Sequence, residues 1–130
     1  MQIVAVNTNV THPTGSVIER PSGLPGYLFL HYAGASLLLT ERGLCEEEAG
    51  VCVLYPPGVA HKSVAHREDL PADGVYFRGP EAGPLIFALE LPVNAAFYPR
   101  DTSFIRPTLD GIGTEMTRKE RHWERLRPWG

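Results

Sequence analysis

The sequence predicts a mainly β protein, a sandwich or barrel of short antiparallel strands followed by a C-terminal α-helical segment. Two observations point to this fold class. Short apolar runs recur as far as Leu91, separated by turn signals drawn from 13 glycines and 12 prolines, which favours a sandwich or barrel over alternating βα units. Beyond Pro107, Leu109, Ile112 and Met116 recur at intervals of three and four residues, as on one face of a helix.

Length and composition narrow the possible functions. A chain of 130 residues forms one domain that needs neither a metal nor a disulfide to fold. Its net charge of -3 argues against binding nucleic acid by itself. Cys45 and Cys52 lack the spacing of metal ligands, so we interpret them as buried reduced thiols, which suits the cytoplasm. We expect no signal peptide at the start and no membrane-spanning stretch.

The N-terminal residues are expected to form an arm and one short strand. Within the arm, residues 1–14, Ile3–Val6 adds one edge strand and Asn7–Thr14 is a loop. The next strand, Gly15–Arg20, ends at a dense cluster of proline and glycine.

The following strands differ in how their two faces are covered. Tyr27–Tyr32 and Leu37–Thr40 are apolar on both faces, which predicts two central strands, each with a cavity on one side and a packed layer on the other. Leu44–Glu48 carries three consecutive glutamates and is expected to be a solvated edge strand.

The stretch from Gly50 to His61 combines a strand, a turn and an imidazole. Val51–Tyr55 is a short apolar run rich in β-forming residues. The two prolines that follow cannot donate to a ladder, and Gly58 supplies the positive φ of a tight turn. His61 is therefore expected at the first position of the next strand, where side chains commonly reach the mouth of a cavity.

The rest of the chain is predicted to pass from strands to a helix. His66–Asp73 is expected to be a loop, Gly74–Arg78 and Leu85–Leu91 strands, and Ala95–Tyr98 a last extended piece. Pro107 fits the first position of the helix, because the N–H that proline lacks has no partner there.

The turn before His61 carries a family motif. The spacing G-x5-P-x-G-x2-H resembles the second motif of the cupin superfamily, whose members are small double-stranded β-helix (jelly-roll) barrels. The family motif continues with an asparagine four residues after the histidine, where this chain has Ala65. The resemblance implies a cupin-like barrel with His61 beside its cavity.

A longer series of motifs is similar to the N-terminal effector-binding domain of AraC-type transcription regulators. The series consists of Arg20–Leu28, a strand ending near Gly34, Pro56–His61 and Val75–Arg78. In that family the barrel binds a small effector, often a sugar, and the helices after it pair two subunits. A separate domain with two helix-turn-helix units reads DNA. The resemblance implies a cytoplasmic sensing and dimerisation domain.

The same resemblance implies a division of the chain and a set of partners. Residues 15–99 would form the effector-binding barrel and residues 100–130 a helical dimerisation segment that stops before the DNA-binding domain. We expect a small-molecule effector, a homodimer, DNA binding only through the missing C-terminal domain, and no membrane. The dimer face would consist of Leu109, Ile112, Met116 and Trp123, although this stripe can equally pack on its own barrel.

The expected effector site combines one cation with polar and aromatic side chains. Arg20 falls on the family position whose guanidinium holds hydroxyl or carboxylate oxygens, although it can equally pair with Glu19 at the surface. His61 lies beside the pocket or bonds to nearby backbone. The expected ligand-binding residues are Arg20, Tyr27, Phe29, His31, His61 and Ser63, with Tyr32 as a further aromatic wall and core packing as the alternative for the aromatic residues. The stacking positions of the arabinose-sensing relatives are replaced by Pro71–Gly74, which argues against a stacked arabinose.

Metal-dependent catalysis is not expected. Cupins that hold a metal use two histidines and a glutamate of the first motif, and those positions fall here on Arg20–Gly23 and Tyr27, none of which is His or Glu. We therefore expect no metal, no cofactor and no catalytic residue. The alternatives are a metal-free enzyme such as a sugar epimerase, with His61 as a base oriented by Asp69 or Asp73, and a stand-alone binding protein.

Overall fold

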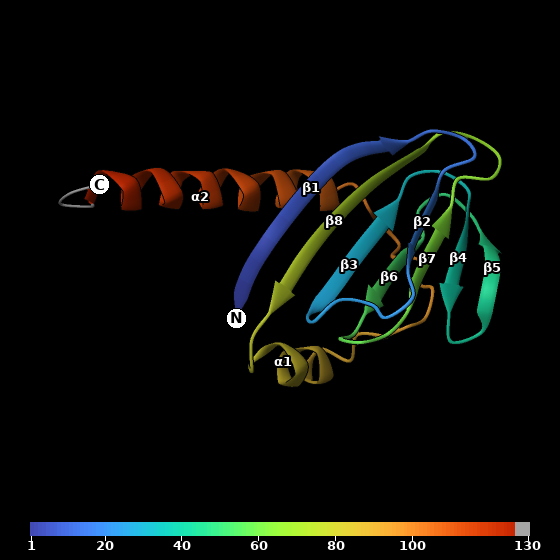
Figure 1. Ribbon diagram of the computed structural model, residues 1–130, viewed down its shortest axis with the longest axis horizontal. Coiled ribbons are helices and arrows are strands. Elements are labelled where there is room, and N and C mark those ends of the chain that lie inside the picture. Colours follow the sequence, from blue (N-terminus) through green and yellow to red (C-terminus); the bar gives the residue numbers. More distant parts are fainter. Residues whose placement is uncertain (127–130) are drawn as a thin grey trace.

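The computed structural model describes the backbone of residues 1–126, with the side chains of residues 1–111, 113, 114, 117 and 118. Over this range the chain is mainly β, as predicted, and forms two four-stranded antiparallel sheets that face each other (Figure 1). The elements in chain order are β1 (Gln2–His12), β2 (Val17–Arg20), β3 (Tyr27–Tyr32), β4 (Ser36–Thr40), β5 (Gly43–Glu47), β6 (Cys52–Tyr55), β7 (His61–Val64), β8 (Leu70–Arg78), α1 (Ala82–Ala88) and α2 (Ile105–Leu126).

The strands pair in a nested pattern. One sheet has the order β1-β8-β3-β6 and the other the order β2-β7-β4-β5, so β1 pairs with β8, β2 with β7, β3 with β6 and β4 with β5. The second half of the strand region thus runs back along the first half. This pairing places Arg20 directly opposite His61, although 40 residues separate them in the chain.

The predicted central and edge positions of the middle strands are confirmed. β3 lies between β8 and β6, and β4 lies between β7 and β5, so both are central strands, while β5 is an edge strand. Residues apolar on both faces belong in such central positions, because each face is covered by another layer. The predicted turn is also present, since Gly58 has a φ of 76° and His61 is the first residue of β7.

Two segments expected to be loops are strands instead. β1 continues to His12, and β8 begins at Leu70, so most of Asn7–Thr14 and the end of His66–Asp73 pair with each other. The register of the pair shifts between Asn7 and Val10, where Asn9 has a φ of 51°. A bulge of this kind breaks the alternation of polar and apolar residues, so the local pattern conceals the strand.

The expected strand Leu85–Leu91 is wrong, because the chain forms helix α1 over Ala82–Ala88. Ala82 and Ile86, four residues apart, are its buried residues, and Pro84 lies in the first turn, where a missing N–H is tolerated. A short apolar run bounded by prolines does not distinguish a strand from a helix. Helix α2 begins at Ile105, two residues before the expected start at Pro107.

The apolar residues form two clusters, one on each side of the first sheet. The cluster between the sheets consists of Tyr32, Leu38, Val51, Val53, Tyr55, Ala65, Leu70 and Ala72. The outer cluster joins the start of α2 to the opposite face of the sheet through Cys52, Ile105 and Leu109. Beyond these contacts α2 runs away from the sheets (Figure 1). Cys52 is buried, as predicted, and burial raises the pKa of its thiol to about 12, whereas Cys45 in the edge strand β5 is only partly buried, which corrects its prediction.

Candidate functional site

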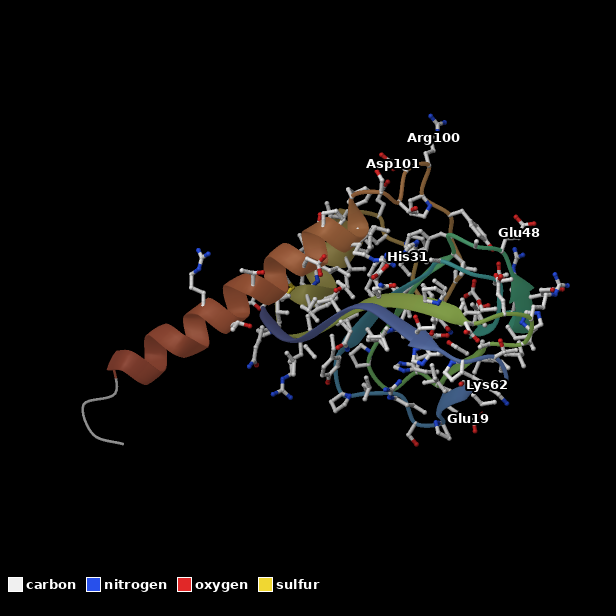
Figure 2. All side chains as sticks on the ribbon, turned by 90° about the horizontal axis from the view of Figure 1, so that it is seen from above. Glu19, His31, Glu48, Lys62, Arg100 and Asp101 are labelled. Carbon is white, nitrogen blue, oxygen red and sulfur yellow. The ribbon has the colours of Figure 1, made fainter. Side chains whose placement is uncertain are left out.

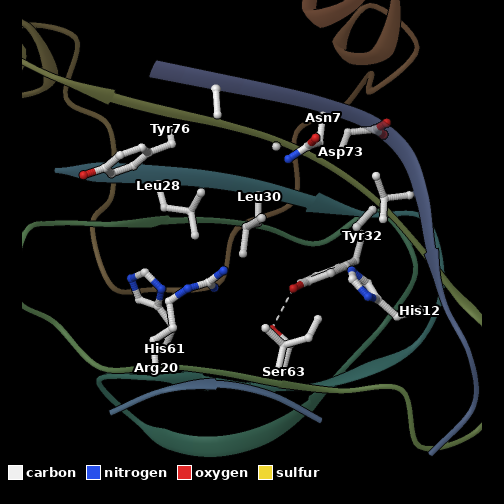
Figure 3. A pocket seen from close by; sticks show the side chains of 15 residues that line it. Asn7, His12, Arg20, Leu28, Leu30, Tyr32, His61, Ser63, Asp73 and Tyr76 are labelled. Atoms are coloured by element: carbon white, nitrogen blue, oxygen red, sulfur yellow. Dashed lines mark hydrogen bonds between the residues drawn. The ribbon is translucent and has the colours of Figure 1, made fainter. Parts of the chain in front are cut away.

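A cavity of about 160 Å³ lies between the two sheets (Figure 3). Its walls are Ala5, Asn7, Val10, His12, Ile18, Arg20, Leu28, Leu30, Tyr32, His61, Ser63, Ala72, Asp73, Gly74 and Tyr76. An engineered protein cavity of about 150 Å³ holds a benzene molecule. The cavity is therefore the right size for a small organic molecule and too small for most drug-sized ligands, whose pockets span about 300–1,000 Å³.

Arg20 enters the cavity from the end of β2. Side chains alternate along a strand, so Ile18 and Arg20 face inward, whereas Glu19 faces outward and pairs with Lys62 at 3.2 Å. Figure 2 shows Glu19 and Lys62 together at the surface. Arg20 is exposed at the strand end, as the alternative held, but it does not pair with Glu19, and within the described residues it has no carboxylate partner.

Close packing of two turns holds the end of β2 against β7. Gly23, in the turn after Arg20, has a φ of 65°, and a Cβ there would collide with the backbone of Val59. Only glycine tolerates both conditions. In the turn before His61, the N–H of Gly58 donates a hydrogen bond to the carbonyl of Leu24 at 2.9 Å. The backbone thereby fixes Arg20 and His61 side by side.

His61 is buried at the cavity wall, with an exposed fraction of 3%. Its ring stacks on Tyr55 with centroids 4.3 Å apart, and among the described residues neither ring nitrogen has a hydrogen-bond partner. The prediction that His61 reaches the cavity is confirmed, and the alternative of a backbone-bonded turn histidine is wrong. Burial, and secondly the charge of Arg20, lower the pKa of His61 to about 4. His61 is thus a neutral imidazole at neutral pH.

Tyr32 and Ser63 supply hydroxyl groups to the same cavity. The Tyr32 hydroxyl donates to Ser63 Oγ at 2.7 Å, and both residues are almost completely buried. Burial raises the pKa of Tyr32, although the hydrogen bond with Ser63 and the charge of Arg20 act in the opposite direction. Ser63 lies in the cavity as expected, and Tyr32 forms the aromatic wall that the sequence suggested.

The predicted site is wrong at three positions, because the cavity is not lined by Tyr27, Phe29 or His31. Leu28, Leu30 and Tyr32 take the inward positions of β3, so the three intervening side chains point to the outer face. There Tyr27 stacks on Phe77 at 5.6 Å, Phe29 packs in the outer cluster beneath α2, and His31 contacts Asp73. Both faces of β3 are largely apolar, so the alternation of side chains along the strand does not by itself identify the inner face.

Three polar residues of the cavity were not predicted from the sequence. Asn7 and His12 come from the part of β1 that was expected to be a loop. Tyr76 lies in the expected strand Gly74–Arg78, and its pairing with Leu28 of β3 places it on the face toward the cavity. Burial lowers the pKa of His12.

Asp73 forms a buried polar network on the outer side of the sheet. Its carboxylate, 1% exposed, accepts from the N–H of Asn9 at 2.8 Å and from Nε and Nη2 of Arg106 at 3.0 and 3.3 Å, and lies 3.0 Å from Nδ1 of His31. Burial acts to raise the pKa of Asp73, but the bonds to Arg106, Asn9 and His31 outweigh it and hold that pKa below its ordinary value. The network joins β1, β3, β8 and the start of α2.

Neither expected carboxylate orients His61. Asp73 is directed away from the cavity (Figure 3), and Asp69 accepts hydrogen bonds from the backbone N–H and the hydroxyl of Thr14, both at 2.9 Å. The dyad of His61 with Asp69 or Asp73 that a metal-free enzyme would use is therefore not formed.

The predicted dimer residues are only partly described. Leu109 is 5% exposed and packs on the outer face of its own sheet, as the alternative interpretation of this stripe held. The side chains of Ile112, Met116 and Trp123 lie outside the described residues.

Among the described residues no three His, Cys, Asp or Glu side chains are grouped so that they could hold a metal ion, and no described helix has the length and apolar character needed to cross a membrane. No protein-family model matches the chain, and no curated protein matches it.

Proposed function

We propose that the chain is a sensing domain that binds a small polar molecule between its two sheets. The observation that carries this proposal is His61, whose two buried ring nitrogens have no hydrogen-bond partner among the described residues, beside the exposed Arg20 in the wall of the same cavity. Buried polar groups are nearly always paired, because an unpaired one loses its hydration without compensation. A bound molecule supplies the missing partner.

The strand topology supports a cupin-like jelly-roll barrel. Nested pairing of eight antiparallel strands into two sheets is the arrangement expected when a long hairpin rolls up into two Greek keys. The G-x5-P-x-G-x2-H motif falls on β6, the following turn and the first residue of β7, where its histidine borders the cavity. Barrel, turn and motif are thus mutually consistent.

The order of the elements supports the effector-binding and dimerisation half of an AraC-type regulator. The strands precede a 22-residue helix, α2, whose start packs on the first sheet and whose remainder runs away from it (Figure 1). A helix without tertiary packing is marginally stable in water. Pairing with α2 of a second copy supplies that packing, and in this proposal DNA is contacted by a separate domain.

Binding without turnover fits the chemistry of the cavity better than catalysis does. A general base needs an oriented partner that sets its tautomer and stabilises its charged form. Asp69 accepts hydrogen bonds from Thr14, and Asp73 contacts His31 and Arg106. Neither carboxylate is therefore available to orient His61. The low pKa of His61 also makes it a weak base.

A ligand titration tests the sensing function. The ring signals of His61 are followed by NMR while sugars, polyols, amino acids and carboxylates are added. We expect at least one class to shift these signals in a saturable way, and Arg20→Gln to weaken the effect. Lys62→Gln is the matched control, because it removes the same charge from the outer face of the adjacent strand. If none of the four classes shifts the His61 ring signals, the sensing function is rejected. If the chain forms a product and His61→Ala abolishes its formation, the chain is an enzyme instead.

A further inference from the structure

The charges around the cavity are unbalanced. Arg20 brings a full positive charge, while His61 is neutral at neutral pH. The one acidic residue of the described lining, Asp73, turns its carboxylate to the opposite face, toward His31 and Arg106 (Figure 3). Glu19, next to Arg20, also faces outward. The described lining therefore attracts an anion.

The donors favour a single carboxylate over a phosphate. A guanidinium presents parallel N–H groups that match the two oxygens of a carboxylate, and the imidazole N–H of His61 lies beside it as a further donor. A phosphate monoester carries a charge of about -1.5 to -2 at neutral pH, which one guanidinium does not balance. The single positive charge of Arg20 therefore matches the single negative charge of one carboxylate.

Apart from the polar side chains of Asn7, His12, Tyr32, Ser63 and Tyr76, the remaining wall is apolar and favours a ligand with few hydroxyl groups. Ile18, Leu28 and Leu30 face the cavity, together with the small or apolar residues Ala5, Val10 and Ala72. A sugar carries a hydroxyl on nearly every carbon, and each hydroxyl placed against an apolar wall loses its hydrogen bonds to water. A short hydrocarbon body loses nothing there and gains from burial.

We propose that the cavity binds small monocarboxylates, with the carboxylate held by Arg20 and His61 and a short, mostly apolar body between Ile18, Leu28 and Leu30. This proposal rests on the sensing function above and names its ligand class. The volume of about 160 Å³ limits the ligand to about the size of benzene, which is the size of a four-carbon acid such as butyrate.

The test compares an acid with its neutral isostere on the full chain. Butyrate, butyramide and arabinose are each titrated by calorimetry at fixed ionic strength. We expect butyrate to bind at least about tenfold more tightly than butyramide, because a hydrogen bond to a charged group outweighs one to a neutral group by that much. Arabinose is expected to bind more weakly still.

Two variants and one control locate the carboxylate. Arg20→Gln is expected to weaken butyrate binding about tenfold or more, and Arg20→Lys to restore part of it, since lysine keeps the charge without the fork. Lys62→Gln is expected to leave binding unchanged, because Lys62 faces outward and pairs with Glu19. A thermal unfolding scan of each variant confirms that it is folded.

The contrary outcomes separate the ligand class from the sensing function. Equal affinity for butyrate and butyramide, or binding of arabinose without butyrate, overturns the carboxylate proposal and leaves the cavity as a sensor of neutral molecules. Equal losses in Arg20→Gln and Lys62→Gln reduce the effect to nonspecific anion attraction and also overturn it. If none of the three compounds binds and His61 is silent in the broader titration, both proposals fail.

Discussion

Replacing Asp73 by asparagine tests how much the buried network stabilises the fold. Asparagine keeps the shape of the side chain and one oxygen for the N–H of Asn9, but it removes the charge that faces His31 and Arg106. Removing one member of a fully buried ion pair costs about 3–5 kcal/mol. Arg106 is 41% exposed and regains water, which lowers the expected loss to about 2–3 kcal/mol.

The assay is urea unfolding followed by circular dichroism at pH 7. A loss of 2–3 kcal/mol corresponds to a fall in the thermal midpoint of about 10 °C for a chain of this length. Asp69→Asn is the matched control, because Asp69 bonds to Thr14 at the surface and its change should be much smaller. If Asp73→Asn unfolds at the same urea concentration as the wild type, the network does not stabilise the protein as argued.

Three further predictions concern His61, the two thiols and Leu109. Folding lowers the pKa of His61 from 6.5 to about 4, so the free energy of unfolding should fall by up to roughly 3 kcal/mol as the pH drops through this range. His61→Leu should remove this pH-dependent loss. Urea midpoints with the same pH dependence in the wild type and in His61→Leu would contradict the prediction. Cys45 should react with a thiol reagent in the native protein while Cys52 stays unmodified, since burial raises the pKa of Cys52; equal rates under native conditions would show that β6 is accessible. Leu109→Ala should lower the free energy of unfolding by about 2–4 kcal/mol even in dilute samples, because Leu109 packs on its own sheet; a loss seen only at concentrations that favour dimers would place it in an interface instead.

The sequence predicted the strands that are strongly apolar and the turns that glycine and proline require. Tyr27–Tyr32 was predicted with the bounds that β3 has, and His61 was placed at the first residue of β7. In both cases the signal is local: a β-rich run between turn residues, or a proline pair followed by a glycine. Arg20 and Ser63 were also placed correctly in the cavity.

What the sequence did not predict depends on contacts between distant residues. Val10 and Ala72 belong to paired strands, yet each segment alone is polar and interrupted, so only their pairing stabilises the extended form. Tyr27, Phe29 and His31 were assigned to the wrong face of β3, because either face of an apolar central strand can be turned inward. For His31 the choice is explained by Asp73 and Arg106, which lie 42 and 75 positions further along the chain.

The nested strand pairing also determines the order in which we expect the strands to form during folding. β4 and β5 are joined by a tight hairpin, in which Thr40 pairs with Gly43, whereas β1 and β8 bring Gln2 and Arg78 together. Closing a short loop loses far less chain entropy than closing a long one, so we expect β4 and β5 to form first and the strand at the N-terminus to join last. Pulsed hydrogen exchange during refolding should accordingly protect the amides of β4 before those of β1.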